Sequence, residues 1–382
     1  MPPTTAPRLL FAVTTDLCFD QRMQRICGSL AAAGYRVQLV GWQRPASPPL
    51  LPQPYQQHRL RGWFQRGKLF YVEYNLRLFV YLLGQRAAAW CACDLDTALP
   101  VWLRARLGGQ PLVYDAHELF TEVPEVVARP AVQRVWRGVE GFVVPRARLA
   151  YTVGPALARV FAQRYGRPFA VVRNVSCLAE GELLPPALAA APASGYILYQ
   201  GALNVGRGLE NLLDAMPQVA GRLVICGEGD LSAALRERAE RLGLLASGKV
   251  EFRGFVLPEA LREVTRHAAV GIMLLENIGL SYYYSLANKF FDYVHAGIPQ
   301  VLIDFPEYRA LNDRFDVAEL VADLAPATLA AALNRLLRDE PARYQHLAAN
   351  CRRAAPQLSW QHEEQELLRL WQEVVPGRAA TL

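Results

Sequence analysis

Two apolar runs joined through a helix-like segment constrain the fold of this chain more than any other stretch. Residues 270–275 and 300–303 are apolar and predicted to be buried strands, and residues 286–295 have the composition of a helix. Ser285 is a residue type that caps helix starts, and Gly297 is typical of a helix end. Two strands joined by one helix form a right-handed parallel crossover, so the sequence predicts an α/β fold with a parallel sheet.

The helix predicted at residues 286–295 carries two charged residues near its start. The free N–H groups of a helix that begins at the carboxyl end of a parallel strand favour an anion. Lys289 adds a full positive charge there, and Asp292 follows on the same face as an acceptor for hydroxyl groups. Only Lys68, Lys249 and Lys289 among the 41 basic residues are lysine. We therefore expect a site for a nucleoside diphosphate; the alternative is a solvated lysine on a surface helix.

The composition of the chain limits the classes of protein to which it can belong. Its 382 residues suffice for two domains, and 52% are hydrophobic, as in a globular protein with a large core. The net charge of +6 suits anionic ligands or an anionic membrane surface, but no basic block or aromatic RNA-binding signature indicates nucleic acid. The seven cysteines are odd in number and scattered, so we expect reduced thiols in a cytoplasmic protein without a signal peptide.

Residues 69–83 are the most apolar stretch, and two interpretations stay open for them. No segment reaches the roughly 20 uncharged apolar residues of a transmembrane helix. Glu73 and Arg77 form an i,i+4 pair, which indicates an ordinary helix. That helix is either a buried core helix or a helix facing a membrane surface. The basic and aromatic residues of 61–68 just before it permit peripheral contact with the inner face of the cell membrane.

The first half of the chain alternates predicted strands and helices. Residues 44–62 are rich in proline and glutamine and are predicted to be a loop. His117 stands between carboxylates just after a predicted strand at 111–114, the edge where α/β proteins hold their chemistry. The alternative interpretation is that His117 is a structural histidine, in a helix cap or in the core. The other predicted strands are residues 9–13, 35–41, 88–92, 149–153 and 169–173.

A second alternation begins after residues 178–195, whose proline, alanine and glycine predict an interdomain linker. A strand at 196–199 leads to a glycine-rich turn at 201–208, and a strand at 222–226 leads to a second turn at 227–229. Glycines at strand ends allow close approach of a ligand to the backbone, although each turn alone is a weak signal. Arg207 in the first turn could reach a phosphate.

Several motifs together resemble the GT-B glycosyltransferases of family 4, which are retaining and use nucleotide sugars. The resemblance covers almost the whole chain. It rests on the glycine turn and helix at 201–215, on Ile225–Gly229, on Val250–Val256, on Ser285–Pro299, on the first-half segments at 20–35, 94–97 and 114–120, and on Trp360. It implies an α/β GT-B fold with two Rossmann-like parallel-sheet domains facing across a cleft. The expected bounds are an acceptor-side domain at 1–177, a linker at 178–195, a nucleotide-sugar domain at 196–358, and a helix at 359–382 that crosses back.

The resemblance also implies roles for residues. It assigns catalysis to His117, Arg207 and Lys289. It assigns donor binding to Gly201, Gly206, Gly227, Gly229, Phe255, Val256, Tyr284, Ser285, Leu286, Ala287, Asn288 and Asp292. It assigns the acceptor side to Asp16, Asp94, Asp115 and Glu118. Two positions depart from the family: the glutamate that contacts the donor sugar corresponds to Tyr284, and an arginine of the glycine turn corresponds to Ala202. Backbone amides of residues 284–288 are therefore expected to do more of the binding.

The implied activity is transfer of a sugar from a UDP- or GDP-linked donor to a hydroxyl of a carbohydrate or lipid-linked acceptor, with retention. No cofactor and no metal are expected. We expect the enzyme to act in the synthesis of cell-surface glycans or glycolipids. A monomer or homodimer that binds no nucleic acid is expected. Two alternatives stay open. One is a non-catalytic protein that binds nucleotide sugars, and the other is a related enzyme such as a 2-epimerase.

Overall fold

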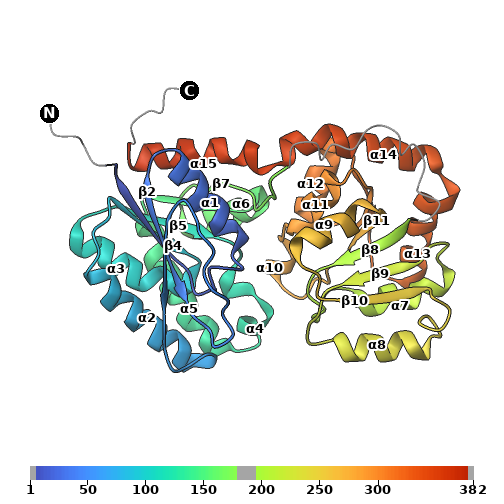
Figure 1. Cartoon of the computed structure of the whole chain (residues 1–382), viewed down its shortest axis with the longest axis horizontal. Helices are drawn as coiled ribbons and strands as arrows, with labels where there is room; N and C mark the ends of the chain where they lie inside the picture. Colours follow the sequence, from blue (N-terminus) through green and yellow to red (C-terminus); the bar gives the residue numbers. More distant parts are fainter. Residues whose placement is uncertain (1–5, 179–194, 377–382) are drawn as a thin grey trace. The chain divides into compact units, whose positions relative to one another are not determined.

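The computed structural model describes residues 6–178 and 195–376. The chain divides into two compact units (Figure 1). The first unit holds Met1–Asn174 and Glu363–Leu382, and the second unit holds Val175–His362. The linker expected at residues 178–195 lies outside the described residues except for its two ends.

The first unit is built on a seven-stranded sheet of order β3-β2-β1-β4-β5-β6-β7. All neighbouring strands in it are parallel. The central strands are buried, which explains why they are recognisable as apolar runs in the sequence. The strands are β1 (Arg8–Ala12), β2 (Arg36–Trp42), β3 (Gln56–Leu60), β4 (Ala89–Cys93), β5 (Leu112–Ala116), β6 (Leu149–Thr152) and β7 (Ala170–Val171).

The edge strand β3 corrects one prediction. Residues 44–62 are predicted to be a loop, but Gln56–Leu60 pair with β2 in parallel register. β3 has a single neighbour and its side chains are only partly buried. Such an edge strand needs no apolar run, so hydrophobic periodicity could not reveal it.

The helices of the first unit cover both faces of this sheet. Right-handed connections from β3 to β4, from β4 to β5 and from β5 to β6 place α2, α3 and α5 on the same face. Consistently, α2 packs against α3, and α3 packs against α5 (Figure 1). The helices are α1 (Gln21–Ala32), α2 (Gly67–Leu83), α3 (Ala98–Gly108), α4 (Pro124–Val127), α5 (Pro130–Val143), α6 (Pro155–Tyr165) and, from Glu363 onward, α15 (Trp360–Val374).

Helix α15 joins the end of the chain to the first unit through one aromatic contact and one ion pair. The Trp371 ring lies 5.0 Å from the ring of Phe11 in β1. The Glu363 carboxylate, which is buried, accepts hydrogen bonds from the backbone N–H and the guanidinium of Arg173, each at 2.8 Å. These contacts fix the helix on residues more than 180 positions earlier in the chain.

The second unit has a six-stranded parallel sheet of order β10-β9-β8-β11-β12-β13. Together the two parallel sheets confirm the predicted α/β class. The strands are β8 (Tyr196–Gln200), β9 (Leu223–Cys226), β10 (Val250–Gly254), β11 (Ala268–Met273), β12 (Gln300–Ile303) and β13 (Ala318–Val321). The helices are α7 (Leu209–Ala215), α8 (Ser232–Arg241), α9 (Pro258–Arg266), α10 (Leu280–Tyr283), α11 (Asn288–His295), α12 (Pro306–Phe315), α13 (Pro326–Asn334) and α14 (Pro341–Ala354).

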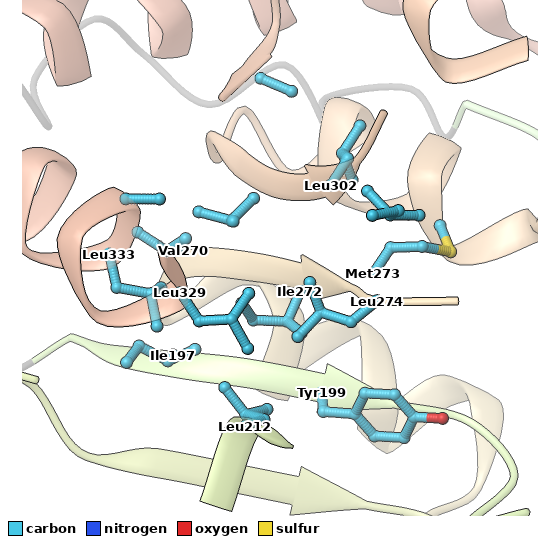
Figure 2. Packing of buried hydrophobic residues seen from close by; sticks show 14 of the residues in the cluster. Ile197, Tyr199, Leu212, Val270, Ile272, Met273, Leu274, Leu302, Leu329 and Leu333 are labelled. Atoms are coloured by element: carbon cyan, nitrogen blue, oxygen red, sulfur yellow. The ribbon is translucent and has the colours of Figure 1, made fainter. Parts of the chain in front are cut away.

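The core of the second unit lies between the central strands and the helices that cover them (Figure 2). Side chains of β8 and β11 meet those of α7 and α13 there, and those labelled in Figure 2 are at most 1% exposed. The labelled residues from these elements include Ile197, Tyr199, Leu212, Val270, Ile272, Leu329 and Leu333. This packing fixes the carboxyl ends of β8 and β11, where the candidate site begins.

The predicted crossover is present, because β11 and β12 are parallel neighbours with α11 between them in the chain. Its helix begins later than predicted. The helix starts at Asn288, and its N-cap is Ala287 in extended conformation rather than Ser285. The short helix α10, which the sequence analysis does not predict, ends just before Ser285. Among the described residues, no helix combines the length and the apolar character needed to cross a membrane.

Candidate functional site

Lys289 and Arg207 are the two cations of the second unit that the sequence predicts at the carboxyl edge of the sheet. The Lys289 ammonium lies 3.8 Å from the ring centroid of Tyr199, at the end of β8. The Arg207 guanidinium lies 4.9 Å from the ring centroid of Tyr282, and its Nε is buried without a hydrogen-bond partner among the described residues. Both aromatic partners escaped the sequence analysis, since nothing in their local sequence marks them.

The charge balance at Lys289 favours an anion. Desolvation lowers the pKa of Lys289 well below its ordinary value, the charge of Arg207 lowers it further, and only Asp292 opposes the shift. Loss of solvent and the charge of Arg207 thus both disfavour the protonated form of Lys289, and one carboxylate only partly offsets them. A bound anion would supply the missing countercharge and would also accept a hydrogen bond from the unpartnered Nε of Arg207.

Two glycine turns bring the backbone close to this pair. Gly201 and Gly227 follow β8 and β9, and a side chain at Gly227 could not be accommodated, since its Cβ would lie 1.9 Å from the carbonyl oxygen of Gly201. A Cβ on Gly201 itself would lie 3.2 Å from the Lys289 ammonium. Gly206 and Gly229 are similarly crowded, by Ile278 and Asn204. These glycines are therefore required for backbone packing, whatever ligand they bind.

Asp292 is held by hydrogen bonds inside the second unit. Its two carboxylate oxygens accept hydrogen bonds from Ser176 Oγ at 2.9 Å and from Gln200 Nε2 at 3.0 Å. Gln200 in turn accepts a hydrogen bond from Thr265. A carboxylate offers about four lone-pair sites in all. The sequence could not reveal Ser176, which lies 116 residues before its partner.

Residues 284–288 form the turn before α11. The Ala287 N–H donates to the Tyr308 hydroxyl at 3.2 Å, so this amide is engaged within the protein. The Leu286 side chain is buried in the core, whereas Asn288 is exposed at the first position of the helix. The Tyr284 ring lies against that of Tyr283. In this turn, the amides at the start of α11 remain those best placed for a ligand.

The segment after β10 presents the two other predicted donor-side residues. Phe255 is 71% exposed, and Val256 is partly buried against a small apolar cluster of the second unit. The Gly227 N–H donates to the Gly254 carbonyl, so this segment is joined to the second glycine turn. An exposed ring next to a glycine turn is suited to stacking on a planar ligand.

In the first unit, His117 lies between two carboxylates. Its Nδ1 is 3.1 Å from Asp94 and its Nε2 is 3.2 Å from Asp115. Burial alone would lower the pKa of His117, but Asp94 and Asp115 outweigh it and raise this pKa well above the ordinary value. Arg22 forms two hydrogen bonds to the fully buried Asp115, and it helps to keep the pKa of that carboxyl low despite burial. His117 is thus an imidazolium that can donate, with its ring about a quarter exposed.

Two further features mark this cluster. Asp94 has φ +62°, a conformation that residues other than glycine rarely adopt, and it accepts a hydrogen bond from the His117 N–H at 2.8 Å. Burial, and next the charge of Asp94, raise the pKa of Asp96 to about 7. Held backbone strain and shifted pKa values are typical of functional sites.

The remaining acceptor-side residues lie differently. Asp16 is buried and accepts hydrogen bonds from Arg59 and Ser47, so its carboxylate is engaged outside the His117 cluster. Glu118 is exposed beside His117. Arg22 and Asp96 join the cluster, although neither was among the predicted site residues. The signal for Asp96 was present in the sequence, two positions after Asp94, whereas Arg22 comes from α1 and could not be assigned without the fold.

Comparisons with known proteins bear on both units. Residues 194–339 match the family model described as glycosyl transferases group 1. Sucrose-phosphate synthase from Thermosynechococcus elongatus has a TM-score of 0.76 at 17% identity, with 96% of this chain and 99% of that chain covered. Anabaena HepE in complex with UDP and glucose has a TM-score of 0.75 at 15% identity, with 96% and 100% covered.

A third similar structure is WaaG, a glycosyltransferase involved in lipopolysaccharide biosynthesis. It has a TM-score of 0.70 at 15% identity, and the match covers 97% of this chain and 100% of that chain. A sequence comparison with curated proteins gives no match. The match to the glycosyl transferases group 1 model therefore lies in the second unit, and the chain as a whole has the fold of these solved GT-B structures, with two parallel-sheet units.

Proposed function

We propose that this protein is a retaining glycosyltransferase that moves a sugar from a nucleoside diphosphate sugar to a hydroxyl acceptor, without a metal. The observation that carries the proposal is the pair Lys289 and Arg207 beside two glycine turns: the charge of Arg207 lowers the pKa of Lys289, and the buried Nε of Arg207 has no hydrogen-bond partner among the described residues, so that an anion would satisfy both groups. In the similar HepE structures the bound molecules are UDP, UDP with glucose, and UDP-glucose, which supports UDP as the first nucleotide to test.

The proposed chemistry places the growing charge of the leaving group on these cations. The bond between the anomeric carbon and the phosphate oxygen breaks as the acceptor oxygen bonds to the same face of the sugar. The proton of the acceptor hydroxyl passes to the departing phosphate. Lys289, Arg207 and the start of α11 stabilise the diphosphate that leaves, and one such donor is typically worth roughly 10²–10³ in turnover.

His117 has a different part in this proposal. Both ring nitrogens face carboxylates and the pKa is raised, so the side chain cannot act as a general base near neutral pH. We assign His117 a place beside the sugar or acceptor, to which it contributes positive charge, with Asp94 and Asp115 as positioning residues. Phe255 and Val256 are assigned to the base, and Asp292 to the ribose.

A thermal-shift panel of UDP, GDP, their sugars and the free nucleosides tests the proposal. Saturation at 100 times Kd stabilises the folded protein by about 2.7 kcal/mol. We expect a diphosphate to raise Tm in the absence of metal and the corresponding nucleoside to do much less. Turnover with an acceptor then separates a transferase from a binding protein, and conversion of the sugar nucleotide without acceptor would identify an epimerase. A panel with no shift for any diphosphate would refute the anion site.

One specific observation supports the alternative hypothesis that the protein binds nucleotide sugars without catalysing a reaction. Tyr284 stands where the family has the glutamate that contacts the donor sugar, and its ring packs on Tyr283. A tyrosine offers one hydroxyl in place of two carboxylate oxygens. Binding of UDP-sugar without turnover across a panel of acceptors would favour this second function.

A further inference from the structure

Helix α2 has an apolar stripe that the core does not use. Its inner face packs Phe70, Tyr74, Leu78 and Leu82 into the first unit, where each is at most 5% exposed. A second stripe on the solvent side consists of side chains that are 51–65% exposed, namely Leu69, Val72, Leu76, Val80 and Leu83. Spacings of three and four place them on one helix face over a length of about 21 Å.

The neighbouring elements extend this apolar surface. α3 packs against α2 on the same face of the sheet and exposes Leu99, Leu103 and Leu107 at intervals of four residues. The turn before α2 exposes Trp63, which is 83% exposed and lies under the Arg77 guanidinium at 4.7 Å. We call the outer faces of α2 and α3, together with Trp63, the α2–α3 face. An apolar surface of this extent marks an interaction site.

The exposed charges of α2, α3 and α5 all have one sign. Every exposed charged residue of α2, α3 and the adjacent α5 is basic: Lys68, Arg106, Arg134 and Arg137. These three helices contain two acids, and neither is available at the surface. The Glu73 side chain is 9% exposed and binds the N–H groups of Trp63 and Phe64, and Glu140 is fully buried.

We propose that the α2–α3 face binds the surface of a membrane that contains anionic phospholipid. Apolar side chains enter the boundary between headgroups and acyl chains, and the basic residues contact the lipid phosphates. A second copy of this chain fits the charges less well, because a symmetric contact would bring basic rims together. The proposal is independent of the proposed transferase activity.

The experiment is co-sedimentation of the full chain with vesicles. Vesicles of phosphatidylglycerol and phosphatidylcholine in equal parts are compared with vesicles of phosphatidylcholine alone. We expect partition into the anionic vesicles only, and a decrease as salt is raised from about 0.1 to 1 M, where the Debye length falls from about 10 to 3 Å. The double variant Lys68→Gln, Arg106→Gln should lower partition by roughly 25-fold, since each basic residue near such a surface contributes about fivefold.

Apolar insertion is tested separately. The double variant Leu76→Ser, Val80→Ser should lower partition by at least tenfold, because a buried aliphatic side chain contributes roughly that factor or more. The matched control is Leu242→Ser, Leu245→Ser in the second unit, whose leucines are 40% and 38% exposed. It should leave partition unchanged. Brominated lipid should also quench fluorescence of the wild type more than that of Trp63→Phe.

Three outcomes would overturn the proposal. The first is absence of partition into anionic vesicles at low salt. The second is an equal loss in the control variant. The third is a wild-type dimer, seen by analytical ultracentrifugation without vesicle binding, that Leu76→Ser, Val80→Ser converts to monomer; this would assign the face to a second copy. Circular dichroism and an unchanged Tm in the absence of lipid would show that each variant is folded.

Discussion

Replacing Lys289 by methionine should have opposite effects on the free protein and on nucleotide binding. The free protein holds a lysine whose pKa is well below its ordinary value because of desolvation and the charge of Arg207. A lowered folded-state pKa means that, between that pKa and about 10.4, the unfolded chain binds more protons than the folded one. The free energy of unfolding therefore rises with pH across this window, and charged Lys289 is a cost at neutral pH. Lys289→Met removes the cost, so the free variant should be at least as stable as the wild type at pH 7.

The effect on UDP binding follows from the charge-assisted contact that is lost. A hydrogen bond to a charged group is worth about 1.5–3 kcal/mol, so the Kd should rise by roughly 10- to 150-fold. At a UDP concentration of 100 times the wild-type Kd, the wild type gains about 2.7 kcal/mol, and a variant with a 100-fold higher Kd gains about 0.4 kcal/mol. For a domain of this size, Tm should rise by roughly 5–11 °C in the wild type and by about 1–2 °C in the variant.

Differential scanning fluorimetry at pH 7, with and without UDP, measures both quantities. Lys249→Met is the matched control, since the Lys249 ammonium donates to the Val219 carbonyl in the same unit and has no assigned ligand. It should keep the full UDP-induced shift even if its own Tm falls. A Lys289→Met protein with an undiminished shift would refute the assignment of Lys289 to the diphosphate. A free variant that is much less stable than the wild type would refute the charge argument.

Two further predictions concern the His117 cluster and the glycine turns. Because the pKa of His117 is raised, its contribution to stability is complete below about pH 6.5 and is lost as pH rises through the folded-state pKa. Urea unfolding at several pH values should show this loss in the wild type and a flatter profile above pH 6.5 in His117→Gln. The Asp96 carboxyl, with a pKa of about 7, lowers the free energy of unfolding with rising pH mainly between about pH 4 and 7. Gly227→Ala should lower the free energy of unfolding by more than about 2 kcal/mol, since its Cβ would lie 1.9 Å from a carbonyl oxygen. The control Gly243→Ala, with φ +70° but no atom within 4 Å of its Cβ, should lower it by only about 1–2 kcal/mol. Equal losses of this free energy in urea unfolding would contradict the steric account.

Most of the fold could be predicted because buried parallel strands reveal themselves as apolar runs. The central strands of both sheets were recognisable in this way, and so was the crossover through α11. The edge strand β3 has polar residues and one neighbour, so it carries no such signal. The start of α11 was misplaced because Ser285 is a good capping residue in isolation, whereas the turn after α10 holds Ala287 at the N-cap.

The residues of the candidate site likewise fall into those that local sequence indicates and those that only the fold reveals. Lys289, Arg207 and the glycines could be named from the sequence, because a charge in a helix first turn and glycines after strands have a local meaning. Tyr199 and Ser176 could not, since they matter only through partners about 90 to 116 residues away. Contacts of this kind depend on strand order, and the order of a parallel sheet is not written in any single segment.

The three lysines show what composition alone could and could not indicate. This chain uses arginine for nearly every cation, so each lysine invites a separate explanation. Lys68 is exposed at the start of α2, and Lys249 donates to a backbone carbonyl; neither position needs a compact ammonium for catalysis. Lys289 is different, because its ammonium lies 3.8 Å from the centroid of the Tyr199 ring and would lie 3.2 Å from a Cβ on Gly201, so the larger guanidinium of arginine has little room there. A bound diphosphate would raise the pKa of Lys289 again, so that binding and protonation would reinforce each other at this position. Rarity drew attention to all three residues, and the surroundings of the side chain separate Lys289, which we assign to the nucleotide, from the exposed Lys68 and from Lys249.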